Sequence, residues 1–338
     1  MAESALDHIV EDLRSSGSRY FPQHSELKTL RVVGHTPRPD HYTYEIVLDF
    51  DDGNERVNAK IYRGKSASRA LQELALREAQ HLEFARQAAD RKKLGGVPRP
   101  IGDFADVGAV VSTKVNGLPL QGIVMKVALL PDCGSPSLLE AAARQAGEWL
   151  RQFHQATAGI PLPVDGDAEL AEIRQLCSRA RKDGLPDEST DAILGSAKNA
   201  LAKQKRAARS SALLREFLPL NVLVSENGVG FAEFAALSQQ GHSLYDAAVF
   251  LAAVEALEKY PFCRLDLISL VQEAFVQGYK VAPEEEALLD TLKMKVLLQM
   301  FAQGRTVKES AERKKVMWAN VMKRFLEHAA RRAAARAA

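Results

Sequence analysis

The chain has few cysteines, and none is placed where a metal or a disulfide framework needs one. Only 3 cysteines occur among 338 residues. They lie far apart, form no CxxC pair and have no histidine at ligand spacing. This pattern argues against both kinds of site. It is typical of small side chains buried in a protein of a reducing compartment.

Long apolar runs and an excess of charge are also absent. One apolar stretch, residues 122–130, is short and contains Lys126, so it lacks the length of a membrane span. The opening MAESALDHIVEDL lacks the basic region and apolar core of a signal peptide. Lys and Arg number 45 against 43 Asp and Glu, which requires no nucleic-acid or acidic-membrane partner. We therefore expect a soluble, cytoplasmic protein with no membrane insertion and no nucleic-acid partner.

The first part of the chain has the texture of β-structure. Residues 27–63 are rich in Val, Ile, Tyr and Thr, and the Asp51–Asn54 turn separates two of the segments. This predicts an antiparallel meander. Residues 4–14 predict a short amphipathic helix before it. Residues 68–93 predict a long helix after it, which ends at a Gly-Gly-Val-Pro sequence.

The remainder of the chain is predominantly helical in pattern. One more strand is expected in VGAVVSTKV, and from Ser137 onward we expect helices with a single hairpin at residues 221–234. Residues 164–212 are polar and helix-forming, which is compatible with an insertion or with a cap over a cleft. Strands first and helices later, with 46% apolar residues to form a core, predict an α+β arrangement.

One carboxylate interrupts the apolar stripe of the long helix. Glu78 lies four residues after Leu74 and four before Leu82, on the face expected to be buried. A buried carboxylate is costly unless it meets a cation. In the preceding strand, Lys60 alternates with the apolar residues and so points away from their core. A Lys60–Glu78 pair would explain both residues, although an exposed lysine and a glutamate at the stripe's edge explain them equally well.

Polar residues gather near the open end of the predicted hairpin. The pair Asn227-Gly228 between apolar runs predicts a two-residue loop. In that register Val222 faces Glu233, so Asn221 and Glu233 lie at the same end. Glu216 lies five residues before Asn221. Amide and carboxylate oxygens suit Mg²⁺, but taken alone these residues are better explained as the solvated end of an ordinary hairpin with surface charges.

In this order the segments resemble the kinase-like phosphotransferases of the aminoglycoside phosphotransferase and choline kinase group. Lys60 in VNAKIYR looks like the strand lysine that holds the α- and β-phosphates of ATP. Glu78 in LREAQHLEF looks like its partner glutamate. AARQAGEWLRQFHQA resembles the helix before the catalytic region. The resemblance covers roughly residues 28–300. It implies a protein-kinase-like two-lobed fold, with a small antiparallel-sheet N-lobe and a mainly helical C-lobe.

The same resemblance implies a hinge between the lobes. STKVNGLPL, residues 112–120, is similar to the segment on whose backbone groups the adenine docks. Thr113 and Val115 are the residues there that the resemblance assigns to the nucleotide. The expected division is then residues 1–111 for the N-terminal lobe and 121–338 for the C-terminal lobe.

The catalytic residues follow from the family motif HGDxxxxN. The matching stretch is LREFLPLN, residues 214–221, which implies Glu216 as the catalytic residue and Asn221 as a metal ligand. Glu233-Phe234-Ala235 corresponds to the family's Asp-Phe-Gly, which implies Glu233 as the other metal ligand. GHSLYD, residues 241–246, resembles the segment whose aspartate braces the catalytic loop.

The departures from the family pattern are specific. Glu216 and Glu233 both replace aspartate, Leu214 replaces the motif's histidine, and Ala235 replaces its glycine. The nucleotide-loop region, residues 34–42, has no glycine-rich turn, and its prolines remove backbone donors. Each Asp-to-Glu change moves a carboxylate by roughly 1 Å, which can cost on the order of a hundredfold in rate. Both positions nevertheless keep their negative charge.

Three hypotheses remain open at this point. The first is an ATP- and Mg²⁺-dependent kinase that phosphorylates a hydroxyl of a small molecule, with Glu216 as the base. The second is a pseudokinase that binds a nucleotide or a protein partner without phosphoryl transfer, in which Arg215 would pair with Glu233 in place of a metal. The third is an unrelated α+β scaffold in which the motif matches are chance.

Overall fold

The computed structural model divides the chain into two compact units. The first comprises Met1–Gly117 together with Gly230–Leu237, and the second comprises Leu118–Val229 together with Ser238–Ala338. The residues described are 2–64, 69–129, 135–204, 207–260, 263–306, 323, 325–327 and 329–331. We describe each unit by itself.

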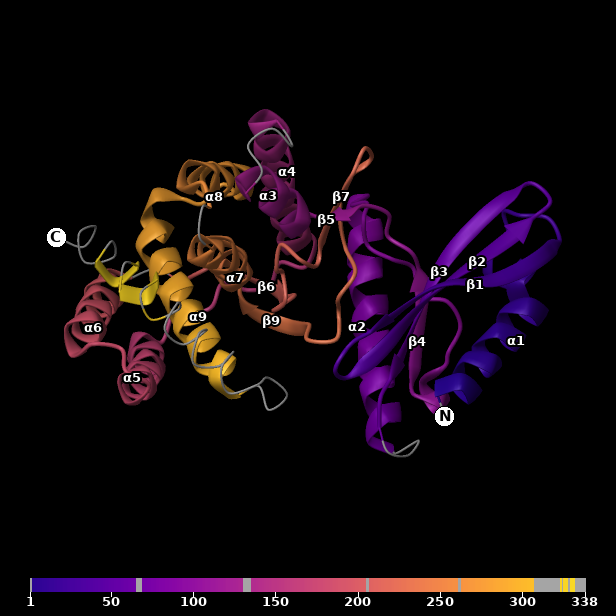
Figure 1. Ribbon diagram of the computed structural model, residues 1–338, viewed down its shortest axis with the longest axis horizontal. Coiled ribbons are helices and arrows are strands. Elements are labelled where there is room, and N and C mark those ends of the chain that lie inside the picture. The colour runs from indigo at the N-terminus through magenta and orange to yellow at the C-terminus, as the bar shows by residue number, and fades with distance from the viewer. Residues whose placement is uncertain are drawn as a thin grey trace. The chain divides into compact units, whose positions relative to one another are not determined.

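The first unit is a four-stranded antiparallel sheet with a helix on each face (Figure 1). Its strands follow one another in the order β1-β2-β3-β4. The elements are α1 (Ala2–Tyr20), β1 (Leu27–Pro37), β2 (His41–Phe50), β3 (Gly53–Tyr62), α2 (Arg69–Lys92), the 3₁₀ turn η1 (Ala105–Val107) and β4 (Ala109–Thr113).

The alternation of side chains along β3 determines which face of the sheet packs against α1 and which against α2. Val57, Ala59 and Ile61 are buried in a cluster that includes Ile9 and Leu13 of α1. Lys60 and its neighbours of the same parity face the other side, because side chains alternate along a strand. That side carries α2. The meander and the long helix were predicted, but α1 is longer than the predicted 4–14 helix.

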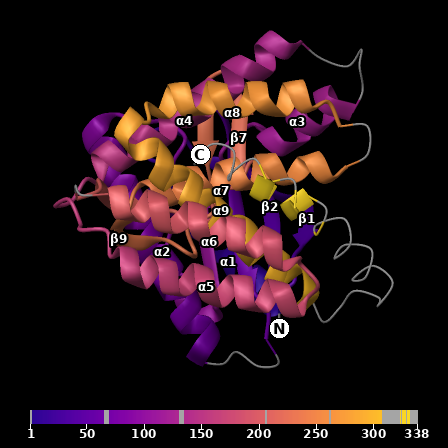
Figure 2. The ribbon, with the colours of Figure 1, turned by 90° about the vertical axis from the view of Figure 1, so that its left-hand side faces the viewer.

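The second unit is mainly helical. Its helices are α3 (Leu120–Leu129), α4 (Pro136–Ala156), α5 (Gly166–Lys182), α6 (Asp187–Lys203), α7 (Leu244–Glu255), α8 (Leu265–Tyr279) and α9 (Glu286–Thr306), with 3₁₀ turns η2 (Ala256–Lys259) and η3 (Pro283–Glu285). One core cluster joins α5, α6, α7 and α9. The region interpreted as an insertion or a cap contains α5 and α6, which pack against each other and against α9 (Figure 2).

Two glycines bring α4 and α8 into close contact. A Cβ on Gly147 would lie 2.3 Å from the carbonyl oxygen of Phe275, and one on Gly278 would lie 2.1 Å from that of Arg144. Neither position therefore has room for a side chain. The two helices pack against each other, and α8 lies next to α4 in Figure 1.

The second unit has more strands than the sequence predicted. The strands are β5 (Leu118–Pro119), β6 (Ser210–Leu213), β7 (Val222–Ser225), β9 (Ser238–His242) and the start of β8 (Gly228–Phe231), whose last two residues belong to the first unit. β5 pairs with β7, and β6 pairs with β9. The prediction of a single hairpin was wrong because it missed these non-local pairings. The predicted loop was also wrong by one residue, since Glu226 and Asn227 form it and Gly228 already begins β8 with φ 113°.

The cysteines and the apolar helices were also addressed by the sequence predictions. Among the residues described, Cys177 and Cys263 are free thiols, and Cys133 lies outside the described residues. Within the same residues, no helix combines the length and apolar character needed to cross a bilayer.

Candidate functional site

Lys60 and Glu78 form the ion pair that the sequence indicated. The ammonium nitrogen of Lys60 on β3 lies 3.0 Å from Oε1 of Glu78 on α2. The side chains are only 13% and 6% exposed, so the pair is largely shielded from solvent. Glu78 follows Ala75 and precedes Leu82 on the buried face of α2, as helical spacing requires. Leu74, which we counted in that stripe, is exposed instead.

A second carboxylate reaches the same ammonium group. Glu233 Oε1 lies 2.6 Å from Lys60 Nζ. Glu233 belongs to the segment 230–237, which packs within the first unit. Backbone bonding fixes the segment: the amide of Phe231 donates to Gly96, and the ring of His81 bonds the carbonyl of Phe234 at 3.1 Å. The position predicted to hold a metal thus contacts the position predicted to hold phosphate.

The two carboxylates set the protonation of Lys60. Burial acts to lower the pKa of its ammonium, but Glu78 and Glu233 outweigh burial and raise the pKa above the ordinary lysine value. Lys60 therefore carries a full positive charge at neutral pH. Two negative groups next to one cation leave a net negative cluster, which a bound cation would compensate.

Tyr62 completes this cluster, and it was not among the residues predicted for the site. Its hydroxyl donates to Oε2 of Glu78 at 2.5 Å, and its ring centroid lies 5.4 Å from Lys60 Nζ. Tyr62 is 9% exposed. The signal that was available is its position two residues after Lys60, because residues i and i+2 of a strand share a face.

The loop between β1 and β2 differs from a glycine-rich phosphate loop, as the sequence indicated. Its turn is closed by the Arg38 amide, which donates to the carbonyl of His41, and by the Arg63 amide, which donates to the carbonyl of Asp40. The imidazole of His41 contacts the Asp40 carboxylate at 2.9 Å. Burial, followed by the charge of Lys60, lowers the pKa of His41.

The two residues assigned to adenine differ in what their backbones already bind. The amide of Thr113 donates to the Arg99 carbonyl at 2.8 Å, and its hydroxyl accepts from the Arg99 amide at 2.8 Å. The next amide, that of Lys114, donates to Arg56. Among the described residues, no hydrogen bond engages the amide of Val115. Of these amides, Val115 supplies the one that a ligand can use.

In the second unit, a buried aspartate holds the loop at 214–221. Asp246 on α7 is fully buried, and its carboxylate accepts the amides of Leu214 at 2.7 Å and Arg215 at 2.8 Å. Arg215 has φ 61°, a left-handed conformation that is unfavourable for a residue with a side chain. The two bonds stabilise that turn. The predicted bracing by the GHSLYD segment is therefore present.

The ends of this loop are anchored on either side of Glu216. Phe217 is fully buried and its ring stacks on Trp149 at 5.8 Å between centroids. The amide nitrogen of Asn221 donates to the carbonyl of Glu216 at 3.0 Å, which leaves the amide oxygen of Asn221 for another partner. Glu216 is exposed at the surface of the second unit. The loop thus presents one carboxylate from a fixed backbone.

A buried polar chain lies behind the loop. His154 on α4 contacts Asp246 at 3.1 Å through Nε2 and the hydroxyl of Tyr279 at 2.9 Å through Nδ1. Both ring nitrogens are therefore occupied. His154 therefore acts as a buried hydrogen-bonding residue. The chain gives Asp246 a third partner in addition to the two loop amides.

Each unit contains one of the two predicted metal ligands. Asn221 of the second unit offers an amide oxygen and Glu233 of the first unit a carboxylate, and both are hard oxygen ligands of the kind that Mg²⁺ prefers. Among the described residues, no cluster of three or more His, Cys, Asp or Glu side chains forms a metal cage. Mg²⁺ is often bound by only one or two protein groups together with phosphate oxygens, so a protein cage of several side chains is not required.

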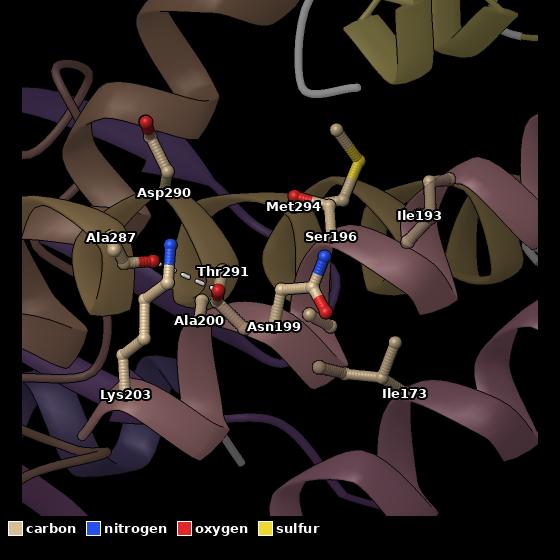
Figure 3. Close-up of a pocket in the computed structure, with 11 residues that line it drawn as sticks. Ile173, Ile193, Ser196, Asn199, Ala200, Lys203, Ala287, Asp290, Thr291 and Met294 are labelled. Carbon is tan, nitrogen blue, oxygen red and sulfur yellow. Dashed lines mark hydrogen bonds between the residues drawn. The ribbon is translucent and has the colours of Figure 1, made fainter. Parts of the chain in front are cut away.

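A cavity of about 110 Å³ lies elsewhere in the second unit, between α5, α6 and α9 (Figure 3). Ile173, Ile193 and Met294 form its apolar part, and Lys203 and Asp290 are among its polar residues. It contains none of the residues predicted for the site. Its volume is well below the roughly 300 Å³ of the smallest ordinary ligand pockets. We therefore base the candidate site on the side-chain clusters and not on this cavity.

Comparison with known proteins yields structural but not sequence relatives. No family model and no curated protein matches the chain. A glucosamine kinase solved with glucosamine, ADP and inorganic phosphate has a TM-score of 0.54 at 13% identity, over 93% of this chain and 97% of that one. A choline kinase from Cryptosporidium parvum has a TM-score of 0.54 at 11% identity, over 97% and 96%. A spectinomycin phosphotransferase solved with ADP and spectinomycin has a TM-score of 0.51 at 9% identity, over 97% and 98%.

These likenesses define the class of fold. The chain has the protein-kinase-like fold of the aminoglycoside phosphotransferase and choline kinase group, with a small antiparallel-sheet lobe and a mainly helical lobe. The predicted resemblance and the predicted fold class are confirmed, and the hypothesis of an unrelated scaffold is excluded. At identities this low the likeness carries no substrate from those proteins to this one.

Proposed function

We propose that the protein is an ATP- and Mg²⁺-dependent phosphotransferase that acts on a hydroxyl of a small molecule. The observation that carries the proposal is the shielded contact of Lys60 with both Glu78 and Glu233 on a kinase-like sheet. A lysine held in this way is a preformed site for the phosphates of a nucleotide. The ADP bound in two of the structural neighbours supports the choice of nucleotide.

The residues of the chain have separate roles in this proposal. Lys60, braced by Glu78, neutralises charge on the phosphates, and the amide of Val115 with the backbone of Thr113 holds the adenine. Glu216 orients the acceptor hydroxyl and takes its proton at a carboxylate oxygen. The fixed backbone of the 214–221 loop positions that carboxylate.

Asn221 and Glu233 would hold Mg²⁺ in the loaded protein. When bound, the metal neutralises charge on the phosphate oxygens during transfer. Glu233 has to exchange its contact with Lys60 for this role. Its side chain is 24% exposed, against 6% for Glu78, so it is the less confined of the two carboxylates.

One observation favours a second candidate function, that of a pseudokinase. Glu233 already has a cation, Lys60, at 2.6 Å. This carboxylate neutralises the charge of Lys60 without a metal or a phosphate. In addition, the 37–41 turn has no glycine-rich sequence that could bind phosphates through its backbone amides. In that case the fold would bind a nucleotide or a protein partner without transfer.

Nucleotide binding and turnover separate the two functions. We expect ADP with Mg²⁺ to raise the melting temperature of the full chain, because a ligand at about 100 times its Kd stabilises by roughly 2.7 kcal/mol. ADP formation from ATP should then appear with one or more alcohols of a panel of sugars, amino alcohols and aminoglycosides.

Variants assign the activity to the site. Lys60→Met should abolish the ADP-dependent shift, and Glu216→Gln should lower turnover by about a hundredfold or more. Glu226→Gln is the matched control, because Glu226 is exposed in the hairpin loop. It should behave as the wild type. A nucleotide-induced shift that needs no Mg²⁺, with no turnover on any acceptor, would favour the pseudokinase. No shift at all would contradict nucleotide binding.

A further inference from the structure

Tyr62 holds the one oxygen of Glu78 that Lys60 does not use. Lys60 contacts Oε1 of Glu78 at 3.0 Å and the Tyr62 hydroxyl donates to Oε2 at 2.5 Å. We propose that Tyr62 is a positioning residue of the candidate nucleotide site, whose hydroxyl anchors Glu78 so that Lys60 keeps one fixed carboxylate and exchanges the other. The inference rests on the proposed function for its ligand, but its geometry is independent of it.

Because Glu78 and Tyr62 are both buried, the hydrogen bond from the Tyr62 hydroxyl to Glu78 cannot readily be replaced by water. Glu78 is 5% exposed and Tyr62 is 9% exposed, so neither oxygen of Glu78 has ready access to water. A buried carboxylate oxygen that loses its donor costs more than an ordinary hydrogen bond contributes. Burial and the neighbouring Glu78 raise the pKa of Tyr62, so the hydroxyl remains a donor across the physiological range.

The backbone of Tyr62 is fixed in turn. Its amide donates to the carbonyl of Gly108 at 3.0 Å, and in the sheet it is the register partner of His41. The phenol therefore projects from a rigid strand rather than from a loop. Because Tyr62 and Lys60 are two residues apart, their side chains share one face of β3, and both reach Glu78 on α2. A hydroxyl on a rigid strand therefore fixes the position of the Glu78 carboxylate.

The two carboxylates around Lys60 are then unequal. Glu78 has partners on both oxygens and is almost fully enclosed, whereas Glu233 contacts Lys60 through Oε1 and is the more exposed. When a phosphate competes for the ammonium, Glu233 is the partner that leaves. Without the Tyr62 hydroxyl, Glu78 would rotate away as well, and Lys60 would lose its fixed orientation.

A ligand-free experiment tests the anchor directly. The full chain is treated with an amine-acetylating reagent, and the rate at Lys60 is followed by mass spectrometry of its peptide. Tyr62→Phe should raise that rate about three- to tenfold, because loss of a charge-assisted bond frees Glu78. Tyr20→Phe is the matched control in the same unit, since Tyr20 donates to Asp12 at 2.7 Å. It should leave the rate at Lys60 unchanged.

A second variant separates anchoring from general loosening. Glu78→Gln should raise the acetylation rate of Lys60 by a similar factor, and the double variant should add little, because both changes act through one contact. A general loosening would make the two effects multiply and would also raise the rates at other lysines of the unit. Wild-type rates in Tyr62→Phe would overturn the proposal.

ADP affinity supplies the readout at the site itself. Titration with ADP and Mg²⁺ should show about five- to tenfold weaker binding in Tyr62→Phe. In a Lys60→Met background the same change should have no further effect, since the tyrosine acts through the lysine. An equal loss in both backgrounds would indicate a structural role only. If the wild type binds no ADP, the proposed function is wrong, and the acetylation rates still decide the role of Tyr62.

Discussion

At the residue scale, buried charge is the feature that organises both the cluster around Lys60 and the cluster around Asp246. Glu78 was identifiable because a carboxylate in an apolar helical stripe requires a cation, and a lysine of the right parity was available. Tyr62 was not identifiable in the same way. An aromatic residue in a strand is normally explained by packing, and only the structure shows its hydroxyl directed at Glu78.

Asp246 is the residue whose replacement should affect the 214–221 loop most. We expect Asp246→Asn to lower the free energy of unfolding by about 2–4 kcal/mol. The NH₂ group of asparagine would face a buried N–H donor whose hydrogen bond the Asp246 carboxylate now accepts. Equilibrium denaturation measures the loss. Amide exchange at Leu214 and Arg215 should accelerate in the same variant.

The matched control for this change is Asp266→Asn. Asp266 is exposed and contacts Arg264 at the start of α8, so its replacement should change the free energy of unfolding far less than replacement of Asp246 does. Unchanged exchange at Leu214 and Arg215 in the Asp246 variant would mean that other contacts hold the loop.

At the scale of elements, local patterns were sufficient and non-local pairings were not. The meander, the long helix and the helical remainder each have a periodicity that the sequence displays. β6 is a four-residue strand buried at every position, and β9 is polar, so neither shows the alternation of a half-buried strand. Their pairing across more than twenty residues has no local signal. The hairpin loop was misplaced because Gly228 adopts its positive φ as the first residue of β8.

The contact of α4 with α8 provides a test at this scale. Gly147→Ala should destabilise the protein by about 3 kcal/mol or more, because its Cβ would overlap the backbone of α8. Gly122→Ala on α3 is the control, since no atom lies within 4 Å of the added carbon. That change should be neutral or stabilise by up to about 1 kcal/mol. Similar melting temperatures for the two variants would contradict the close helix contact.

At the scale of the whole molecule, the order of motifs identified a fold that overall sequence similarity does not reveal. No family model matches, yet the fold is shared with proteins of 9–13% identity. Burial pattern and element order persist when identities do not, because many apolar sequences satisfy the same core. Glu216 is exposed and has no such constraint, so a catalytic role for it was suggested only by the resemblance and remains a prediction.

The histidines give the whole molecule a predictable response to acid. Burial lowers the pKa of His41 and of His242. Each therefore contributes stability that is full above the unfolded value of about 6.5 and is lost as pH falls through that value toward the lower folded one. The contact of His24 with Glu55 raises the pKa of His24, so its contribution has the opposite sign and is full below about 6.5.

Melting temperatures measured at about pH 7.5 and at about pH 5.5 test these signs. The His41→Gln, His242→Gln double variant should lose less stability on acidification than the wild type does, because these two imidazoles with lowered pKa no longer have to be charged. His24→Gln should lose more, because it lacks an imidazole whose pKa is raised in the folded protein. The opposite results would be a double variant that loses more stability than the wild type between the two pH values, or a His24 variant that loses less. Either result would show that carboxylates and not these imidazoles control stability in this range.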